Sequence, residues 1–188
     1  MNIGDQRLAL RRRPLFTPLY VGVVLFVVAL ALAGWALAGL WHAPGTVIVV
    51  RHMEKLADAG DDPGLSPAGQ RRAARVAELL AAAGVDAVFA TQYRRTAETA
   101  LPLAERLSLP LHVYDARDTE ALVRDVNATY RDQTVVIVGH SNTVPEIVEA
   151  FSGEEIGAIS EDRYGDVYLV TRPKLGRASV TRIFVPEQ

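Results

Sequence analysis

The stretch TVIVVRH, residues 46–52, decides the fold of this chain, and a second stretch, TVVIVGHS at residues 134–141, repeats its pattern. Each begins with a short uncharged run rich in Val and Ile and ends abruptly in polar residues, which is typical of a strand buried in a parallel sheet. Ligands of open α/β sheets bind beyond the carboxyl ends of the strands. The two stretches therefore predict one site that receives Arg51 and His52 from one strand and His140 from the other.

From residue 43 onward the pattern alternates between strands and helices. Ser66 is expected to cap a helix that has Pro67 at its first position, Thr143 and Glu146 to form a capping box, and Pro102 to break or kink its helix. The alternation predicts an α/β three-layer sandwich, a mostly parallel sheet with helices on both faces. Besides the two stretches above, strands are predicted at 86–90, 109–114, 166–171 and 178–185, the last two as an antiparallel pair, and helices at 67–83, 95–107, 119–130 and 143–151.

The N-terminal part is apolar. No Asp, Glu, Lys or Arg occurs from residue 14 to residue 50, and about 20 apolar residues suffice to span a bilayer as a helix. A buried core helix would usually have a polar face. Four arginines precede the run and no comparable cluster follows it, so the positive-inside rule places the N-terminus in the cytoplasm. These are Arg7, Arg11, Arg12 and Arg13.

We therefore expect a cytoplasmic tail at residues 1–18, a single-pass transmembrane helix or signal anchor at residues 19–41, and a catalytic domain at residues 43–188 on the periplasmic, extracytoplasmic side of the membrane. A cleaved signal peptide is the alternative interpretation of the apolar run, and it too would export the domain.

Composition excludes several functions. The 188 residues carry a formal net charge of −2, so no broad basic surface indicates a nucleic-acid partner. The chain has no Cys, which excludes disulfides, thiolate metal sites and a cysteine nucleophile. The histidines are spread along the sequence without metal-ligand spacing, so no metal site is expected.

A third segment adds positive charge to the predicted site. TQYRRTAETA, residues 91–100, follows a predicted strand and opens a helix, so Arg94 and Arg95 lie where a helix N-terminus already favours anions. Guanidinium donors suit a phosphoryl group, and an imidazole nitrogen can serve as the nucleophile that accepts it. The three segments together predict a site for phosphoryl chemistry.

These segments resemble the motifs of the histidine phosphatase superfamily, which has the phosphoglycerate mutase-like fold, over about residues 46–185. Arg51 and His52 resemble the family's Arg-His-Gly signature, with Met53 in place of the glycine. LSPAGQ at 65–70 resembles its Leu-Thr/Ser-x-x-Gly helix start, residues 91–100 its Ser-Pro-x-x-Arg-Ala-x-Gln-Thr-Ala segment, and VGHS at 138–141 its second histidine motif.

The resemblance implies hydrolysis of a phosphomonoester through a phosphohistidine on His52, without a cofactor or metal. It implies that Arg51, Arg95 and His140 bind the phosphoryl group and stabilise its charge in the transition state. Because the family's glycine is replaced, Met53 is expected to narrow the backbone approach and reshape the pocket. Cytoplasmic substrates would not meet an exported domain, so we expect a small phosphorylated substrate outside the cytoplasm.

Other residues are expected to support the reaction. A general acid is expected because an alkoxide leaves poorly unless it is protonated. The resemblance implies a Glu in the segment after the third strand, and although the family's motif for it is not found here, Asp118 and Glu120 lie in that segment and are the first candidates. Arg94, Glu54 and Ser141 are expected to contact the substrate. Residues 153–163 are expected to border the substrate entrance.

The sequence also bears on three other functions. A serine hydrolase would use residues 139–143 as a nucleophile elbow, but the fifth residue is Thr and no histidine follows His140, whereas that fold places its catalytic His after the Ser. A membrane-tethered phosphate or ligand sensor, and a phosphomutase that keeps water from its phosphoenzyme, stay open at the level of sequence.

Overall fold

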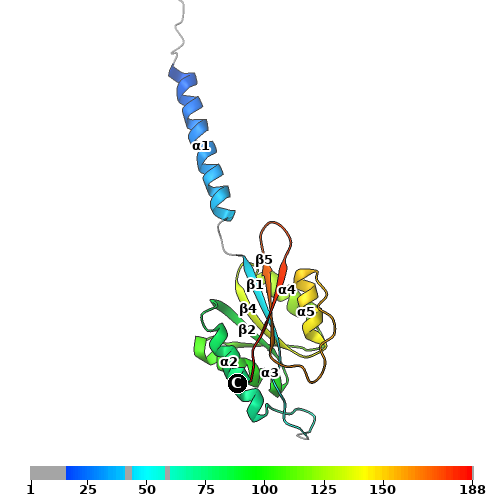
Figure 1. The fold of residues 1–188 in the computed structure, drawn as a ribbon. Coiled ribbons are helices and arrows are strands. Elements are labelled where there is room, and N and C mark those ends of the chain that lie inside the picture. The colour runs from blue at the N-terminus through cyan, green and yellow to red at the C-terminus, as the bar shows by residue number, and fades with distance from the viewer. Residues whose placement is uncertain (1–15, 41–43, 58–59, 188) are drawn as a thin grey trace, which may run out of the picture. The chain divides into compact units, whose positions relative to one another are not determined.

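The computed structural model describes residues 16–40, 44–57 and 60–187, with side chains left out at 16–18 and 36–40 (Figure 1). The chain divides into two compact units, residues 1–42 and 43–188, and each is considered by itself. Most of the predicted cytoplasmic tail, together with Trp41, lies outside the described residues.

The first unit holds one helix, α1 (Phe16–Leu40), where the sequence predicts a helix. From residue 19 to residue 35 its side chains are exposed, including Phe26 at 64 % and Trp35 at 79 %. Over the part of the chain that the structure describes, no helix is both long enough and apolar enough to cross a membrane.

The second unit is built on a six-stranded sheet with the strand order β3-β2-β4-β1-β5-β6. Strands β1 to β4 are parallel, β5 pairs antiparallel with β1, and β6 pairs antiparallel with β5. The mostly parallel sheet and the antiparallel terminal pair are thus confirmed. The strands are β1 (Gly45–Arg51), β2 (Val85–Thr91), β3 (Leu111–Tyr114), β4 (Thr134–Gly139), β5 (Asp166–Arg172) and β6 (Ser179–Phe184).

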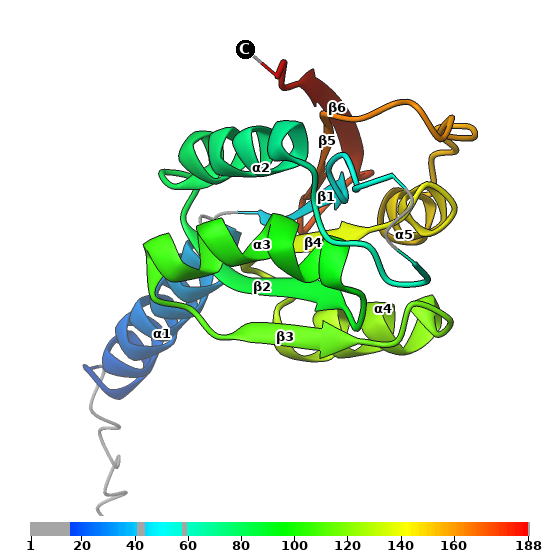
Figure 2. The ribbon, with the colours of Figure 1, turned by 90° about the horizontal axis from the view of Figure 1, so that it is seen from below.

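Helices cover both faces of this sheet, as predicted (Figure 2). They are α2 (Pro67–Leu80), α3 (Arg94–Leu107), α4 (Thr119–Thr129) and α5 (Thr143–Ser152). Because successive side chains of a strand point to opposite faces, Ile48 and Val50 of β1 join the core under α2 and α3, while Val47 and Val49 join the core under α4 and α5. Burial on both faces explains why β1 is uninterruptedly apolar.

Three local predictions met different outcomes. The Ser66 hydroxyl accepts a hydrogen bond from the Gly69 N–H (3.1 Å), so the predicted cap of α2 is confirmed. Of the break or kink expected at Pro102, the break is wrong, because α3 continues to Leu107, the predicted end of this helix, with Leu103 and Ala104 buried in the core. The predicted capping box is also wrong, because the Thr143 hydroxyl accepts from the His140 N–H (2.9 Å) instead of capping α5.

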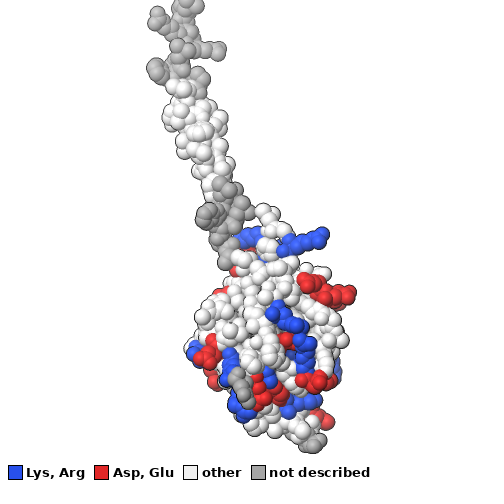
Figure 3. Space-filling model, in the orientation of Figure 1, with Lys and Arg blue, Asp and Glu red and all other residues white. Residues whose placement is uncertain are grey.

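Charged side chains of both signs are interspersed on the face of the second unit that Figure 3 shows, so that no wide field of one sign forms there. The order of the strands, rather than this surface, positions the site, since β4, β1 and β2 are neighbours and end at one edge of the sheet.

Candidate active site

The two histidines follow directly paired residues of neighbouring strands. Arg51 of β1 lies opposite Gly139 of β4 in the parallel ladder, and the His52 N–H donates to the Gly139 carbonyl at 2.9 Å, which continues the ladder by one residue. The His52 and His140 rings therefore leave the same edge, with centroids 5.4 Å apart. Both side chains are buried. The structure thus brings together the two histidines that the sequence predicts to share a site.

The backbone fixes the tautomer of His52. Its Nδ1 lies 2.8 Å from the Met53 carbonyl oxygen, and a carbonyl can only accept, so Nδ1 carries the proton and donates it. Nε2 then keeps its lone pair. Burial, with smaller contributions from Arg51, His140 and Arg95, lowers the pKa of His52 to about 3. His52 is therefore an uncharged imidazole with a free nitrogen at neutral pH, which is the state that a nucleophile requires.

His140 is held from the other side. Its Nε2 lies 3.0 Å from the Thr91 hydroxyl at the end of β2, and its ring packs edge-on against Tyr93. Burial is the main cause that lowers the pKa of His140 to about 4; Arg95 and Arg51 lower it further, and Glu161 raises it. An anion placed between the histidines would act as a second negative charge and raise this pKa.

Arg51 is buried beneath a loop. Its two terminal nitrogens donate to the carbonyls of Ser160 (2.7 Å), Glu161 (2.9 Å) and Arg163 (2.9 Å), and its guanidinium stacks on Tyr164 at 4.3 Å. Its Nε is buried without a hydrogen-bond partner among the described residues. Since an unsatisfied buried donor is costly, Nε is the atom of Arg51 that is suited to hold an anion.

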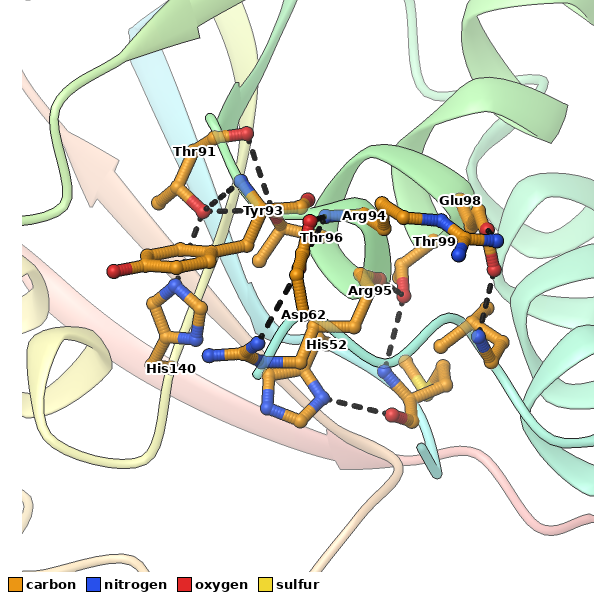
Figure 4. Close-up of polar contacts among 12 residues, drawn as sticks. His52, Asp62, Thr91, Tyr93, Arg94, Arg95, Thr96, Glu98, Thr99 and His140 are labelled. Atoms are coloured by element: carbon orange, nitrogen blue, oxygen red, sulfur yellow. Dashed lines mark hydrogen bonds and ion pairs between the residues drawn. The ribbon is translucent and has the colours of Figure 1, made fainter. Parts of the chain in front are cut away.

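The structure separates the two neighbouring arginines of α3 (Figure 4). Arg95 is 18 % exposed, stacks on Tyr93 at 4.6 Å, and lies 3.7 Å from Asp62. Its charge lowers the pKa values of both histidines. Arg94 is 65 % exposed and pairs with Glu98 at 3.1 Å on the outside of the helix. Arg95 rather than Arg94 is therefore the arginine of this helix that faces the histidines.

Met53, which was expected to narrow the backbone approach and reshape the pocket, has its side chain fully buried in the core beneath α2 and α3. The residue that replaces the glycine of the motif therefore packs in the core. Its N–H donates to the Thr99 hydroxyl (3.0 Å), which in turn donates to the Arg95 carbonyl (2.7 Å). This chain of bonds ties the backbone after His52 to the first turn of α3.

The carboxylates expected to supply a proton are engaged elsewhere. Asp118 caps α4 by accepting from the Ala121 N–H at 2.9 Å. Glu120 is 90 % exposed and lies 3.7 Å from Arg124 on the same helix. Neither interaction brings a carboxylate to the histidines, so the sequence-based choice of acid finds no support in the geometry.

Glu54 also has a different partner from the one expected. Its carboxylate pairs with the largely buried Arg72 of α2 at 2.6 Å, and Arg72 further donates to the Val185 carbonyl at 2.6 Å. This arrangement fastens the segment after His52 to α2. Glu54 is thus held in the framework of the domain rather than extended toward a substrate.

Sequence reasoning missed Glu161 as an individual residue. Its carboxylate accepts hydrogen bonds from Ser141 and from Arg51 (3.1 Å), and its side chain is 74 % exposed. The Ser141 hydrogen bond and the nearby cations lower the pKa of Glu161. No periodicity marks residues 153–165, and only the expectation that 153–163 borders the entrance anticipated it. The Ser141 hydroxyl, which was expected to contact the substrate, donates a hydrogen bond to Glu161.

Taken together, the site offers an uncharged nucleophilic nitrogen, a second imidazole and two guanidinium groups at the carboxyl edge of the sheet. Among the described residues, no cluster of three or more His, Asp and Glu side chains is arranged to hold a metal ion. Such a set of groups is suited to bind a tetrahedral anion and to accept its central atom on nitrogen.

Comparisons with known proteins give a family match over part of the chain and matches in fold. The profile of the histidine phosphatase superfamily (branch 1) matches residues 47–116. The matched stretch includes His52 and Arg95 and ends before His140. No curated protein matches the sequence.

Solved structures share the fold. A mycobacterial glucosyl-3-phosphoglycerate phosphatase, Rv2419c, is 16 % identical, with a TM-score of 0.59 over 77 % of this chain and 100 % of its own. The protein histidine phosphatase SixA complexed with tungstate is 19 % identical, with a TM-score of 0.59 over 74 % and 96 %. The putative phosphohistidine phosphatase SixA from Agrobacterium tumefaciens is 19 % identical, with a TM-score of 0.58 over 75 % and 98 %. At these identities the likeness concerns the fold alone.

Proposed function

We propose that this protein hydrolyses small phosphomonoesters by way of a phosphohistidine on Nε2 of His52. The observation that carries the proposal is the tautomer of His52: the Met53 carbonyl holds the proton on Nδ1 (2.8 Å) and leaves Nε2 as an uncharged nucleophile next to Arg95 and His140. A buried histidine with no chemical task would gain nothing from two neighbouring guanidinium groups that disfavour its charged form.

The residues suggest a two-step transfer. In the first step the lone pair of His52 Nε2 forms a bond to phosphorus, and the bond from phosphorus to the leaving oxygen breaks. The positive charge that develops on the ring is stabilised by the Nδ1–H···O=C bond to Met53. In the second step water attacks phosphorus, the P–N bond breaks, and His52 returns to its uncharged state. Arg95 and Nε of Arg51 are the donors suited to the phosphoryl oxygens.

The test uses the full-length chain, purified in detergent, with a panel of phosphomonoesters and inorganic phosphate as the readout. His52→Asn should abolish both phosphate release and the base-stable, acid-labile phosphoenzyme. His112→Asn is the matched control, because His112 stacks on Phe89 at 5.0 Å within the α4 side of the sheet, and it should retain activity. Full activity of His52→Asn would refute the mechanism, and anion binding without turnover of any ester would favour the sensor.

We further propose that the apolar segment at residues 19–41 anchors the protein in a membrane, with the N-terminus in the cytoplasm and the domain at residues 43–188 on the other side of the membrane. The proposal rests on the sequence: residues 14–50 contain no Asp, Glu, Lys or Arg, and the arginines of the N-terminal region precede this stretch. An outward-facing domain would act on a small phosphorylated substrate in the periplasm or at the outer face of the membrane.

Topology is tested with two reporters fused in turn after Gln188, one that is active only outside the cytoplasm and one that fluoresces only inside it. Activity of the first alone, in the membrane fraction, is expected. Fluorescence of the second alone would overturn the localisation and return cytoplasmic phosphomonoesters to the list of substrates, while the mechanism on His52 would be unaffected.

A further inference from the structure

A chain of buried hydroxyl groups leads from the start of α3 to His140 (Figure 4). The Thr96 hydroxyl lies 2.7 Å from the Tyr93 carbonyl oxygen and 2.7 Å from the Thr91 hydroxyl, which lies 3.0 Å from Nε2 of His140. Thr91 and Thr96 are 1 % and 0 % exposed, so water does not compete for these bonds. Thr96 occupies the position where the motif quoted above has alanine.

The protons in this chain can be assigned by counting. A carbonyl only accepts, so the short contact with Tyr93 requires the single proton of the Thr96 hydroxyl. Thr96 then accepts from Thr91, whose single proton is thereby used. Thr91 has only lone pairs left for His140, and therefore Nε2 of His140 must carry a proton. The reverse order would leave two oxygen acceptors 2.7 Å apart with no proton between them.

This assignment determines what the other ring nitrogen can do. Nδ1 of His140 lies on the side of the ring that faces Arg95 and His52 (Figure 4). In the uncharged Nε2–H form, Nδ1 presents a lone pair, which repels an anionic oxygen. It can donate a hydrogen bond to a phosphoryl group only after it has gained a proton.

We propose that Thr91 and Thr96 are positioning residues that hold His140 as the Nε2–H tautomer, so that His140 takes up one proton on Nδ1 when a tetrahedral dianion binds. The inference deepens the proposed function and rests on it for the identity of the anion. During turnover, that proton passes from Nδ1 to the leaving oxygen as the P–O bond breaks, and the water that hydrolyses the phosphohistidine returns a proton to Nδ1.

The tautomer can be read without any substrate. In ¹⁵N spectra of the full-length protein in detergent at pH 8, His140 should show a protonated Nε2 and an unprotonated Nδ1. In Thr96→Val, Thr91 loses its acceptor and becomes free to donate to Nε2, so the protonated nitrogen should change to Nδ1. Thr181→Val, an exposed position on β6, is the matched control and should keep the wild-type pattern. A protonated Nδ1 in the wild-type protein would overturn the proposal.

Binding of tungstate, a dianion that does not titrate near neutral pH, provides the functional readout. Calorimetry in buffers of different ionisation enthalpy should show uptake of about one proton by the wild type, with affinity falling about tenfold per pH unit between pH 7 and 9. In Thr96→Val, proton uptake should approach zero and the affinity should become nearly independent of pH. Equal proton uptake by the wild type and by Thr96→Val would refute the proposed role of Thr91 and Thr96.

The two proposals can fail separately. Proton-coupled tungstate binding without turnover of any ester would leave the role of Thr91 and Thr96 intact and reject the phosphatase. Phosphatase activity that depends on His52, together with an Nδ1–H tautomer of His140 in the wild type, would reject the proposed role of Thr91 and Thr96. The proposed phosphatase function would then still stand.

Discussion

Lowering the pH from 7 to 5 should destabilise this domain through its two active-site histidines. The folded state keeps both rings uncharged, because the pKa of His52 is about 3 and that of His140 about 4. In the unfolded chain a histidine has a pKa near 6.5. Between these values the unfolded state binds more protons than the folded state, so the free energy of unfolding falls as the pH falls.

The size of the effect follows from the pKa values. At pH 5 an unfolded histidine is almost fully protonated, whereas the folded rings still hold few protons. Each histidine then costs about 2 kcal/mol relative to pH 7, and the pair about 4 kcal/mol. Above pH 6.5 the two histidines cost the domain little free energy of unfolding. Below that pH the cost grows progressively until the pH reaches the folded-state pKa values near 4 and 3. For a domain with about 5–15 kcal/mol of stability in total, that loss is large.

Urea unfolding of the full-length protein at several pH values, followed by circular dichroism, tests this expectation against the double variant His52→Asn/His140→Asn. The variant should lose about 4 kcal/mol less than the wild type between pH 7 and pH 5, and each single variant about 2 kcal/mol less. Carboxylates that titrate in this range affect all the proteins alike and cancel in the difference. An equal loss in the wild type and the double variant would refute the argument that burial keeps both rings uncharged.

Three further substitutions test the framework of the site. Gly69→Ala would place a Cβ 2.2 Å from the Glu54 carbonyl oxygen, so urea unfolding should show a loss of about 1–3 kcal/mol together with a lower kcat. Thr99→Val removes the acceptor of the buried Met53 N–H and should cost about 1–3 kcal/mol; an unchanged rate of phosphoenzyme formation would argue against its role behind the nucleophile. Glu161→Gln removes a carboxylate that competes with the substrate for a guanidinium, so the Ki of inorganic phosphate should fall about fivefold at low salt, and an unchanged Ki would contradict this.

The apolar runs of β1 and β4 made the sheet predictable, because strands buried on both faces need uninterrupted Val and Ile and end where polar residues begin. The same runs placed His52 and His140 at one edge, since parallel neighbours end together. Pro102 and Thr143 were misjudged for a shared reason. Local propensity was outweighed in α3 by burial of the following turn, and at α5 by the hydrogen bond that the Thr143 hydroxyl accepts from the His140 N–H.

The supporting groups were harder to foresee. In the sequence, Met53 is noticeable only because it stands where the Arg-His-Gly motif has glycine. The packing of α2 and α3 shows that its side chain fills the core. Asp118 and Glu120 were candidate acids because they lie in the segment after the third strand, where the resembled family has its acid, yet Asp118 caps α4 and Glu120 pairs with Arg124 of the same helix. Glu161 reaches Arg51 across 110 residues of sequence through an irregular loop, which carries no periodic signal.

The sequence by itself determined the α/β class, the strands that end in Arg51-His52 and Gly139-His140, and the arginines that open α3, because these features depend on residue type and on spacing along the chain. The tertiary structure alone decided which nitrogen of each histidine carries a proton, which arginine faces the pocket and which carboxylates approach it. Those properties depend on hydrogen bonds and charges between segments far apart in sequence, and their strength is set by burial that exists only once the sheet and its helices have packed.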